Sequence, residues 1–212
     1  MADNYLEYRQ QEIAEASRGK APRPKYPSLD TLLHRNRSYR GYDPSRVVGE
    51  AELREMVRAT TLVASGMNRQ PLRYRLVSGG EARLVLSLIT LGGALPQEHL
   101  PHPGQEPGAF IVVCSAVPED RVVDIDLGFA AQTLLLRATE MGLGGIFILN
   151  FRKKELREAL ALPLEPLAVI AVGKPAESVY LRPVESGAAS LAYYRKDGVH
   201  YVPKLTLEQI LI

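Results

Sequence analysis

The segment that most constrains the fold is a long stretch, from about Asp124 to Met141, with apolar residues almost all round a helix. Asp124 and Asp126 open it and Gly142 stops it, because carboxylates favour the start of a helix and glycine favours the residue after its end. Such a helix has no face that suits water, so other structure must cover it. We therefore expect either the central helix of the fold or a helix at an interface.

Apolar runs without alternation predict three strands that are buried on both faces, at 109–114, 144–149 and 167–173. Strands and helices are mixed, with few clean βαβ units, so the α+β class is favoured over a doubly wound sheet. The remaining expected elements are helices over about 3–18, from Ser28 into 35–40, 50–60, 81–89, 152–160 and 206–211, and strands at 72–77 and 201–202. No regular periodicity is found between Pro175 and Tyr193.

Length and composition predict one ordinary domain. Of the 212 residues, 46% are hydrophobic and 24% charged, which excludes wholesale disorder. We expect a polar N-terminal helix and proline-rich linker over 1–27, and a single domain over 28–212. One cysteine excludes a disulfide scaffold and a zinc finger. A net charge of +2 gives no nucleic-acid signature. We found no targeting segment and no apolar run near the roughly 20 residues of a membrane span, so we expect a cytoplasmic protein without membrane or nucleic-acid partners.

A cluster of cations, Arg35-Asn36-Arg37-Ser38-Tyr39-Arg40, is the first candidate binding segment. Arginine side chains grip phosphate oxygens in pairs, and Ser38 adds another donor. The alternative is a solvated helix end, where arginine also favours the helix dipole.

The polar loop Ser65-Gly66-Met67-Asn68-Arg69-Gln70-Pro71 is the second. Asparagine and glutamine amides present acceptors and donors together, which suits the edge of a pyrimidine-like ring. Gly66 would allow a ligand to approach the backbone closely. An ordinary turn before the strand at 72–77 is the alternative.

Two further segments are less specific. Gly142-Leu143-Gly144-Gly145 is neither a P-loop nor a dinucleotide fingerprint, and a helix C-cap explains its first glycine. The segment from Tyr194 to Lys204 is cationic and aromatic, and its Asp197-Gly198 predicts a hairpin turn. A plain surface hairpin is the alternative there.

Taken together and in this order, these motifs resemble the nitroreductase family of flavin-dependent oxidoreductases. Arg37-Ser38-Tyr39-Arg40 is similar to the family's arginine-rich motif, with Asn36 in place of its first arginine. The loop 64–72 is similar to the family's P-S-x-x-N-x-Q-P-W, apart from Ala64 and Leu72. The resemblance continues through Gly142-Leu143-Gly144, the segment 162–175 and the closing segment 203–210.

The resemblance implies a three-layer α/β/α fold with a mainly antiparallel sheet, in an intertwined homodimer that binds FMN at its interface. Arg35, Arg37, Ser38 and Arg40 of one subunit would meet the phosphate or the pyrimidine edge, with Arg40 near flavin N1. Lys204 would add a phosphate cation. The loop residues Ser65, Gly66, Met67, Asn68 and Gln70 would come from the other subunit, and the backbone of Leu149 and Asn150 would lie beside flavin N5.

The implied activity is an FMN-dependent reductase that takes hydride from NAD(P)H and reduces a nitroaromatic, a quinone or a similar small molecule by a ping-pong mechanism. The chemistry would be the flavin's, without a catalytic side chain. The alternative is an FMN carrier or sensor without turnover, since the glycine- and proline-rich segment 91–108 could close over the ring. We expect no metal site, because His99 and His102 have too few further ligands nearby.

Overall fold

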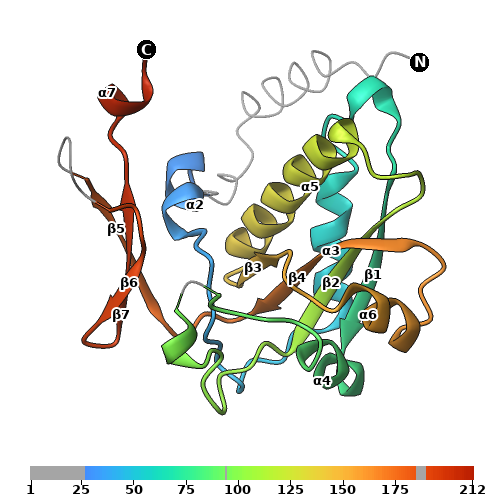
Figure 1. Cartoon of the computed structure of the whole chain (residues 1–212), viewed down its shortest axis with the longest axis horizontal. Helices are drawn as coiled ribbons and strands as arrows, with labels where there is room; N and C mark the ends of the chain where they lie inside the picture. The colour runs from blue at the N-terminus through green and yellow to red at the C-terminus, as the bar shows by residue number, and fades with distance from the viewer. Residues whose placement is uncertain (1–26, 94, 185–189) are drawn as a thin grey trace, which may run out of the picture.

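The computed structural model describes residues 27–93, 95–184 and 190–212 (Figure 1). The helix expected over 3–18 and almost all of the linker after it lie outside these residues. The central sheet has the strand order β1 (Leu72–Ser78), β2 (Ala109–Ser115), β4 (Glu165–Gly173) and β3 (Gly144–Ile148). Every neighbouring pair in it is antiparallel.

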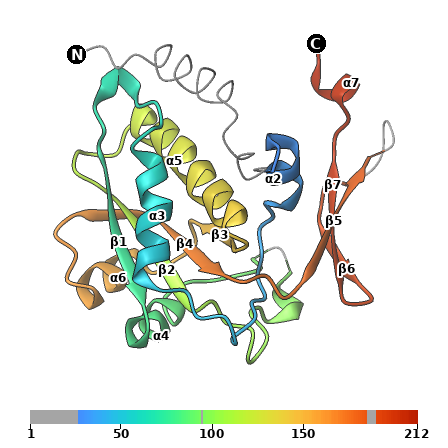
Figure 2. The ribbon, with the colours of Figure 1, turned by 180° about the vertical axis from the view of Figure 1, so that it is seen from behind.

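Helices cover both faces of this sheet (Figures 1 and 2). Helices α3 (Glu50–Thr60) and α5 (Arg121–Glu140) pack on one face, and α4 (Gly80–Leu86) and α6 (Lys153–Ala159) pack on the other. Strand β2 is fully buried because its alternate side chains enter the two cores, Ile111 on the α5 side and Phe110 on the α4 side. The α+β class and the three-layer arrangement are thus confirmed.

A smaller sheet stands beside this body, with the strand order β5 (Ser178–Pro183), β7 (Val199–Lys204) and β6 (Tyr194–Lys196). Asp197 and Gly198, with φ of 53° and 75°, form the predicted hairpin turn between β6 and β7. Strand β5, which pairs with β7 in parallel, was not predicted. Most of its residues are exposed, so no apolar pattern marks it.

The segment after α2 (Leu29–Arg35) corrects one prediction. Ser28 caps α2 as expected, accepting a hydrogen bond from Thr31 N at 3.2 Å. The helix then ends at Arg35 instead of continuing to residue 40. Tyr39 N donates to Gly145 O at 3.2 Å, and Ser38 forms a parallel bridge with Gly145. The cationic segment is therefore extended, because it pairs with the free edge of β3.

Helix α5 has 20 residues and begins at Arg121, three residues before the predicted start. Asp120 is its N-cap, accepting from Val122 N and Val123 N. The helix packs against α3 and the sheet, yet Ile125 and Phe129 remain 46% and 49% exposed. It is the central helix of the fold and also carries an apolar outer face. Helix α7 (Leu207–Ile210) lies near the C-terminus, close to its predicted place.

No helix in the described part of the chain is both long and apolar enough to cross a membrane.

Candidate functional site

The structure brings part of the arginine cluster together with Lys204, across more than 160 residues of sequence. A cavity of about 340 Å³, the cationic cavity, opens between α2, α5 and the smaller sheet. Four of the predicted residues line this cavity: Arg37, Ser38, Arg40 and Lys204. The other lining residues are Leu33, Asn36, Gln132, Leu135, Val179, Tyr193, His200 and Val202.

Arg40 is held in place at the cationic cavity by several contacts. Its side chain is buried, its Nη1 donates to Ser38 O at 2.8 Å, and its guanidinium lies 4.9 Å from the centre of the Tyr193 ring. The Glu177 carboxylate accepts hydrogen bonds from the backbone N–H groups of Arg40 and Gly41, the latter at 3.1 Å. Glu177 also forms a buried ion pair with Arg195. Glu177 therefore fixes the backbone beneath Arg40.

The cavity carries an excess of positive charge. Arg195 compensates Glu177, whereas Arg37, Arg40 and Lys204 form no ion pair with any of the described residues. Burial lowers the pKa of Arg37, but arginine remains charged at neutral pH. Burial first, and then the charge of Arg40, lowers the pKa of His200, so its imidazole is neutral near pH 7. Three cations without a counterion favour an anionic ligand.

Buried polar atoms without a partner test whether a cofactor phosphate would fit here. Arg37 Nε, Arg40 Nε and His200 Nδ1 have no hydrogen-bond partner among the described residues. A buried donor without an acceptor costs about 1–3 kcal/mol. A phosphate or a ring edge with acceptor oxygens and nitrogens would supply acceptors for the two guanidinium Nε–H groups. The donor set thus fits FMN.

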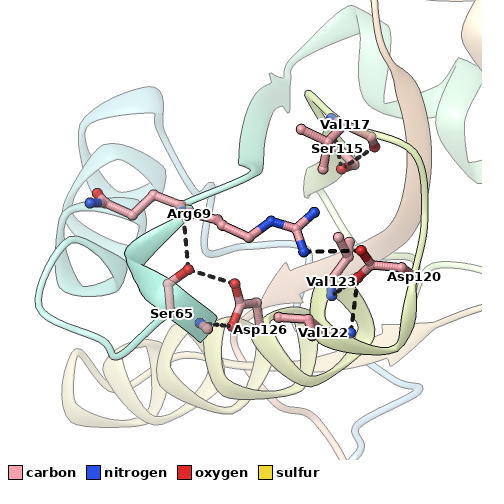
Figure 3. Close-up of polar contacts among 10 residues, drawn as sticks. Ser65, Arg69, Ser115, Val117, Asp120, Val122, Val123 and Asp126 are labelled. Atoms are coloured by element: carbon pink, nitrogen blue, oxygen red, sulfur yellow. Dashed lines mark hydrogen bonds and ion pairs between the residues drawn. The ribbon is translucent and has the colours of Figure 1, made fainter.

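The predicted loop lies at a different place, toward the N-terminal end of α5. Ser65, Asn68 and Gln70 line a second cavity of about 210 Å³, the loop cavity, together with residues of α3, β1 and α5. Asp126 of α5 binds the start of the loop, and Arg69 pairs with Asp120 at 3.0 Å (Figure 3). Met67 has a φ of 52° and points outward, 81% exposed. The loop is thus an ordered structure that presents side chains to the outside.

Five predicted residues line neither cavity: Gly66 and Met67 within the loop, and Arg35, Leu149 and Asn150 elsewhere. Arg35 lies at the end of α2, where its carbonyl accepts from Tyr39 Oη at 2.7 Å. Leu149 and Asn150 are exposed just beyond β3, and Asn150 O accepts from Thr90 N at 2.9 Å. One chain therefore carries two separate groups of predicted residues and leaves Arg35, Leu149 and Asn150 outside both groups.

Sequence reasoning missed four residues that shape the two cavities. Asp126 was expected only to help open α5, yet it is buried against the loop. His200 lies in the segment for which a plain surface hairpin was an alternative, and it lines the cationic cavity. Glu177 and Tyr193 lie in the segment without periodicity and gave no signal. Their role in holding Arg40 in place is visible only from their contacts with it.

Cys114 is buried on β2, as predicted. Burial raises the pKa of its thiol to about 11, so it stays protonated and unreactive near neutral pH. The thiol is therefore a packing group in the core.

A family model described as Nitroreductase family matches residues 33–174, well over half of the chain. The chain therefore belongs to the nitroreductase family.

Solved structures with the same fold share little sequence with the chain. A putative NADH dehydrogenase/NAD(P)H nitroreductase from Bacteroides thetaiotaomicron is 26% identical, with a TM-score of 0.57 over 71% of this chain and 87% of that one. An FMN-dependent nitroreductase from Clostridium difficile is 23% identical, with a TM-score of 0.57 over 71% and 89%. A nitroreductase family protein from Streptococcus pneumoniae is 18% identical, with a TM-score of 0.58 over 77% and 96%. None of the curated proteins matches the chain.

Proposed function

We propose that this chain is an FMN-dependent oxidoreductase that uses NAD(P)H to reduce a nitroaromatic, a quinone or a similar small molecule by a ping-pong mechanism. The observation that carries the proposal is the cationic cavity, where the described residues supply neither counterions for three cations nor acceptors for the buried donors. The family, and the names of relatives described as FMN-dependent or as containing FMN, support the same cofactor.

The chain's own residues would bind and orient the cofactor, which supplies the electron-transfer chemistry when bound. Arg37, Ser38 and Lys204 would hold the phosphate. Arg40, fixed by Ser38 O and the Tyr193 ring, would place its charge beside the pyrimidine edge, where it stabilises negative charge in a site shielded from water. Contacts from Arg35 and from the backbone of Leu149 and Asn150 stay predictions.

We further propose that the domain over 28–212 works as a homodimer, in which the cationic cavity of one chain meets the loop of its partner. Two observations support this arrangement. The two groups of predicted residues lie in separate cavities of one chain, although both cavities include residues of α5. Ile125 and Phe129 expose apolar surface on the same helix, and Leu29 and Leu33 do so on α2. Apolar surface beside two half-sites suits a second copy of the chain.

The carrier or sensor hypothesis depended on the segment 91–108 closing over the cofactor. Of the described residues in that segment, none lines either cavity, and Glu106, Pro107 and Gly108 instead line a cavity beside α4. No observation in the structure favours a carrier over an enzyme. The cytoplasmic location stays a prediction.

The experiment is to purify the chain, add FMN, remove the excess and record the visible spectrum before and after anaerobic addition of NADH or NADPH. We expect a yellow protein that the reduced nicotinamide bleaches and that a nitroaromatic or a quinone restores. A protein that retains no FMN would overturn the proposal. A yellow protein that neither nucleotide bleaches would support the carrier instead.

A further inference from the structure

Asp126 is a buried carboxylate whose two oxygens both bind the loop that follows α3. Its residue is 3% exposed, although it lies on α5 and not on the loop itself. Oδ2 accepts from the Ser65 hydroxyl at 2.6 Å, and Oδ1 accepts from Gly66 N at 2.8 Å (Figure 3). A buried carboxylate is costly unless hydrogen bonds compensate it, so these two bonds fasten the loop to the helix.

The hydrogen bonds continue from Asp126 along the loop as far as Asn68. Because Ser65 donates to the carboxylate, its oxygen is free to accept, and it accepts from Gln70 N at 2.9 Å. Gln70 Nε2 then donates to Asn68 Oδ1 at 2.9 Å. Asn68 is exposed, and with its oxygen accepting from Gln70 its amide N–H groups are the donors that it can offer to a ligand. The carboxylate is thus linked through Ser65 and Gln70 to Asn68, a side chain that lines the loop cavity.

The loop has a strained backbone that needs such an anchor. Met67, Asn68 and Gln70 have φ values of 52°, 54° and 46°, a conformation that costs roughly 1 kcal/mol or more for each residue other than glycine. Gly66 lies so close to α5 that an added Cβ would clash with the Val122 side chain. The three strained residues are nevertheless exposed, so the strain secures no core packing. A strained loop that is held by a buried side chain and presents polar side chains outward is typical of a binding element.

We propose that Asp126 is a positioning residue, which acts through Ser65 and Gly66 to hold Asn68 and Gln70 against the ring edge of the flavin bound in the partner's cationic cavity. This inference rests on the proposed function. It assigns Asp126 no contact with the cofactor. It assigns the loop to a ligand edge that carries hydrogen-bond acceptors, as the pyrimidine part of a flavin does.

The test is Asp126→Asn, which keeps the size of the side chain and removes one acceptor. The new amide can still accept from Gly66 N with its oxygen, but its NH₂ group cannot accept from the Ser65 hydroxyl. We expect the FMN dissociation constant of the apoprotein, measured by fluorescence titration, to rise about tenfold, as befits one lost hydrogen bond to a charged group. Asp124→Asn is the matched control, because Asp124 is exposed on the same helix and its side chain forms no hydrogen bond or ion pair with the described residues of the loop. Its FMN dissociation constant should stay within about twofold of wild type.

Two further measurements separate positioning from a general loss of stability. Amide hydrogen exchange of Asp126→Asn should accelerate at Gly66 and Gln70 while the strands of the central sheet stay protected. Ser65→Ala removes the same hydrogen bond between Ser65 and Asp126. The double variant should therefore bind FMN no more weakly than whichever single variant binds it less tightly. If Asp126→Asn fails to fold, Ser65→Ala carries the same expectation for FMN affinity and loop exchange.

The outcomes distinguish this inference from the proposed function. Wild-type FMN affinity in Asp126→Asn or, where that variant does not fold, in Ser65→Ala would overturn the positioning role and leave the FMN proposal standing. A wild-type protein that binds no FMN would overturn the proposed function, and the positioning role with it. A change in affinity without faster exchange in the loop would also overturn the positioning role.

Discussion

The two cavities of this chain differ in how their polar groups are satisfied. In the cationic cavity, Arg37 Nε, Arg40 Nε and His200 Nδ1 lack partners among the described residues. In the loop cavity, Asp126, Ser65 and Gln70 satisfy one another within a single chain. On the proposed function, a ligand would complete the first cavity, whereas the second is already ordered by bonds within one chain. Charge therefore would supply most of the affinity in one, and preorganisation most of the specificity in the other.

Removing positive charge from the cationic cavity should have the largest effect on FMN binding. We expect Arg37→Ala combined with Arg40→Ala to abolish FMN retention, because two of the three cations without a counterion are lost. The measurement is the flavin absorbance that remains with the protein after gel filtration. A double variant that loses Arg54 and Lys154, two exposed cations elsewhere, should retain the cofactor. Full retention without Arg37 and Arg40 would mean that the cluster is only a solvated surface.

Mixing defective chains would show whether the two cavities belong to one site. Asp126→Asn impairs the loop, and the Arg37→Ala, Arg40→Ala variant impairs the cationic cavity. If each site combines two chains, a mixed dimer has one site with both defects and one intact site. After unfolding and refolding together, about a quarter of all sites should bind FMN with wild-type affinity. No recovery, in a mixture shown to contain mixed dimers, would contradict a site shared between chains.

A charge on the outer face of α5 should dissociate the proposed dimer. The cationic cavity of one chain would then no longer meet the loop of its partner, although neither cavity is altered. We expect Phe129→Asp to raise the dimer dissociation constant at least about tenfold, since an unpaired charge in an apolar interface is costly. Sedimentation would measure the dimer, and FMN affinity should fall with it. Leu84→Asp is the matched control, because Leu84 is a partly exposed apolar residue of α4 on the other side of the sheet. A wild-type chain that is monomeric and fully loaded with FMN would refute the interface.

The smallest effect is expected at Arg35, which belongs to the cationic motif but lies outside the cavity. Arg35→Ala should weaken FMN binding by about threefold or less, because an exposed charge acts through solvent. Fluorescence titration beside Arg40→Ala gives the comparison. Equal loss of FMN affinity in Arg35→Ala and Arg40→Ala would contradict this expectation, because it would mean that Arg35 contacts FMN in the complex.

The sequence predicted what depends on local pattern. Strand β2 could be recognised because its residues are apolar on both faces, and the Asp197-Gly198 turn because few residues tolerate its backbone angles. Strand β5 could not, since its sheet is largely exposed. The end of α2 was placed too late because Ser38 and Tyr39 leave the helix to pair with Gly145, a partner more than 100 residues away.

The same distinction holds for the candidate site. Arg37, Arg40 and Lys204 belong to segments with unusual charge, so the sequence alone could single them out. Glu177, Tyr193 and Asp126 have ordinary surroundings in the sequence, and their importance comes from what they touch. Their roles follow from tertiary contacts that no local pattern specifies.

Helix α5 links the two cavities through a single rigid element. Asp126 borders the loop cavity and Gln132 borders the cationic cavity, six residues apart and thus separated by about 9 Å of helix rise. In a symmetric pair of chains, the length of the two copies of this helix would determine the distance between the two sites. One residue inserted between these positions would turn one cavity by about 100° relative to the other. The length of this helix segment is therefore constrained more tightly than its side chains are.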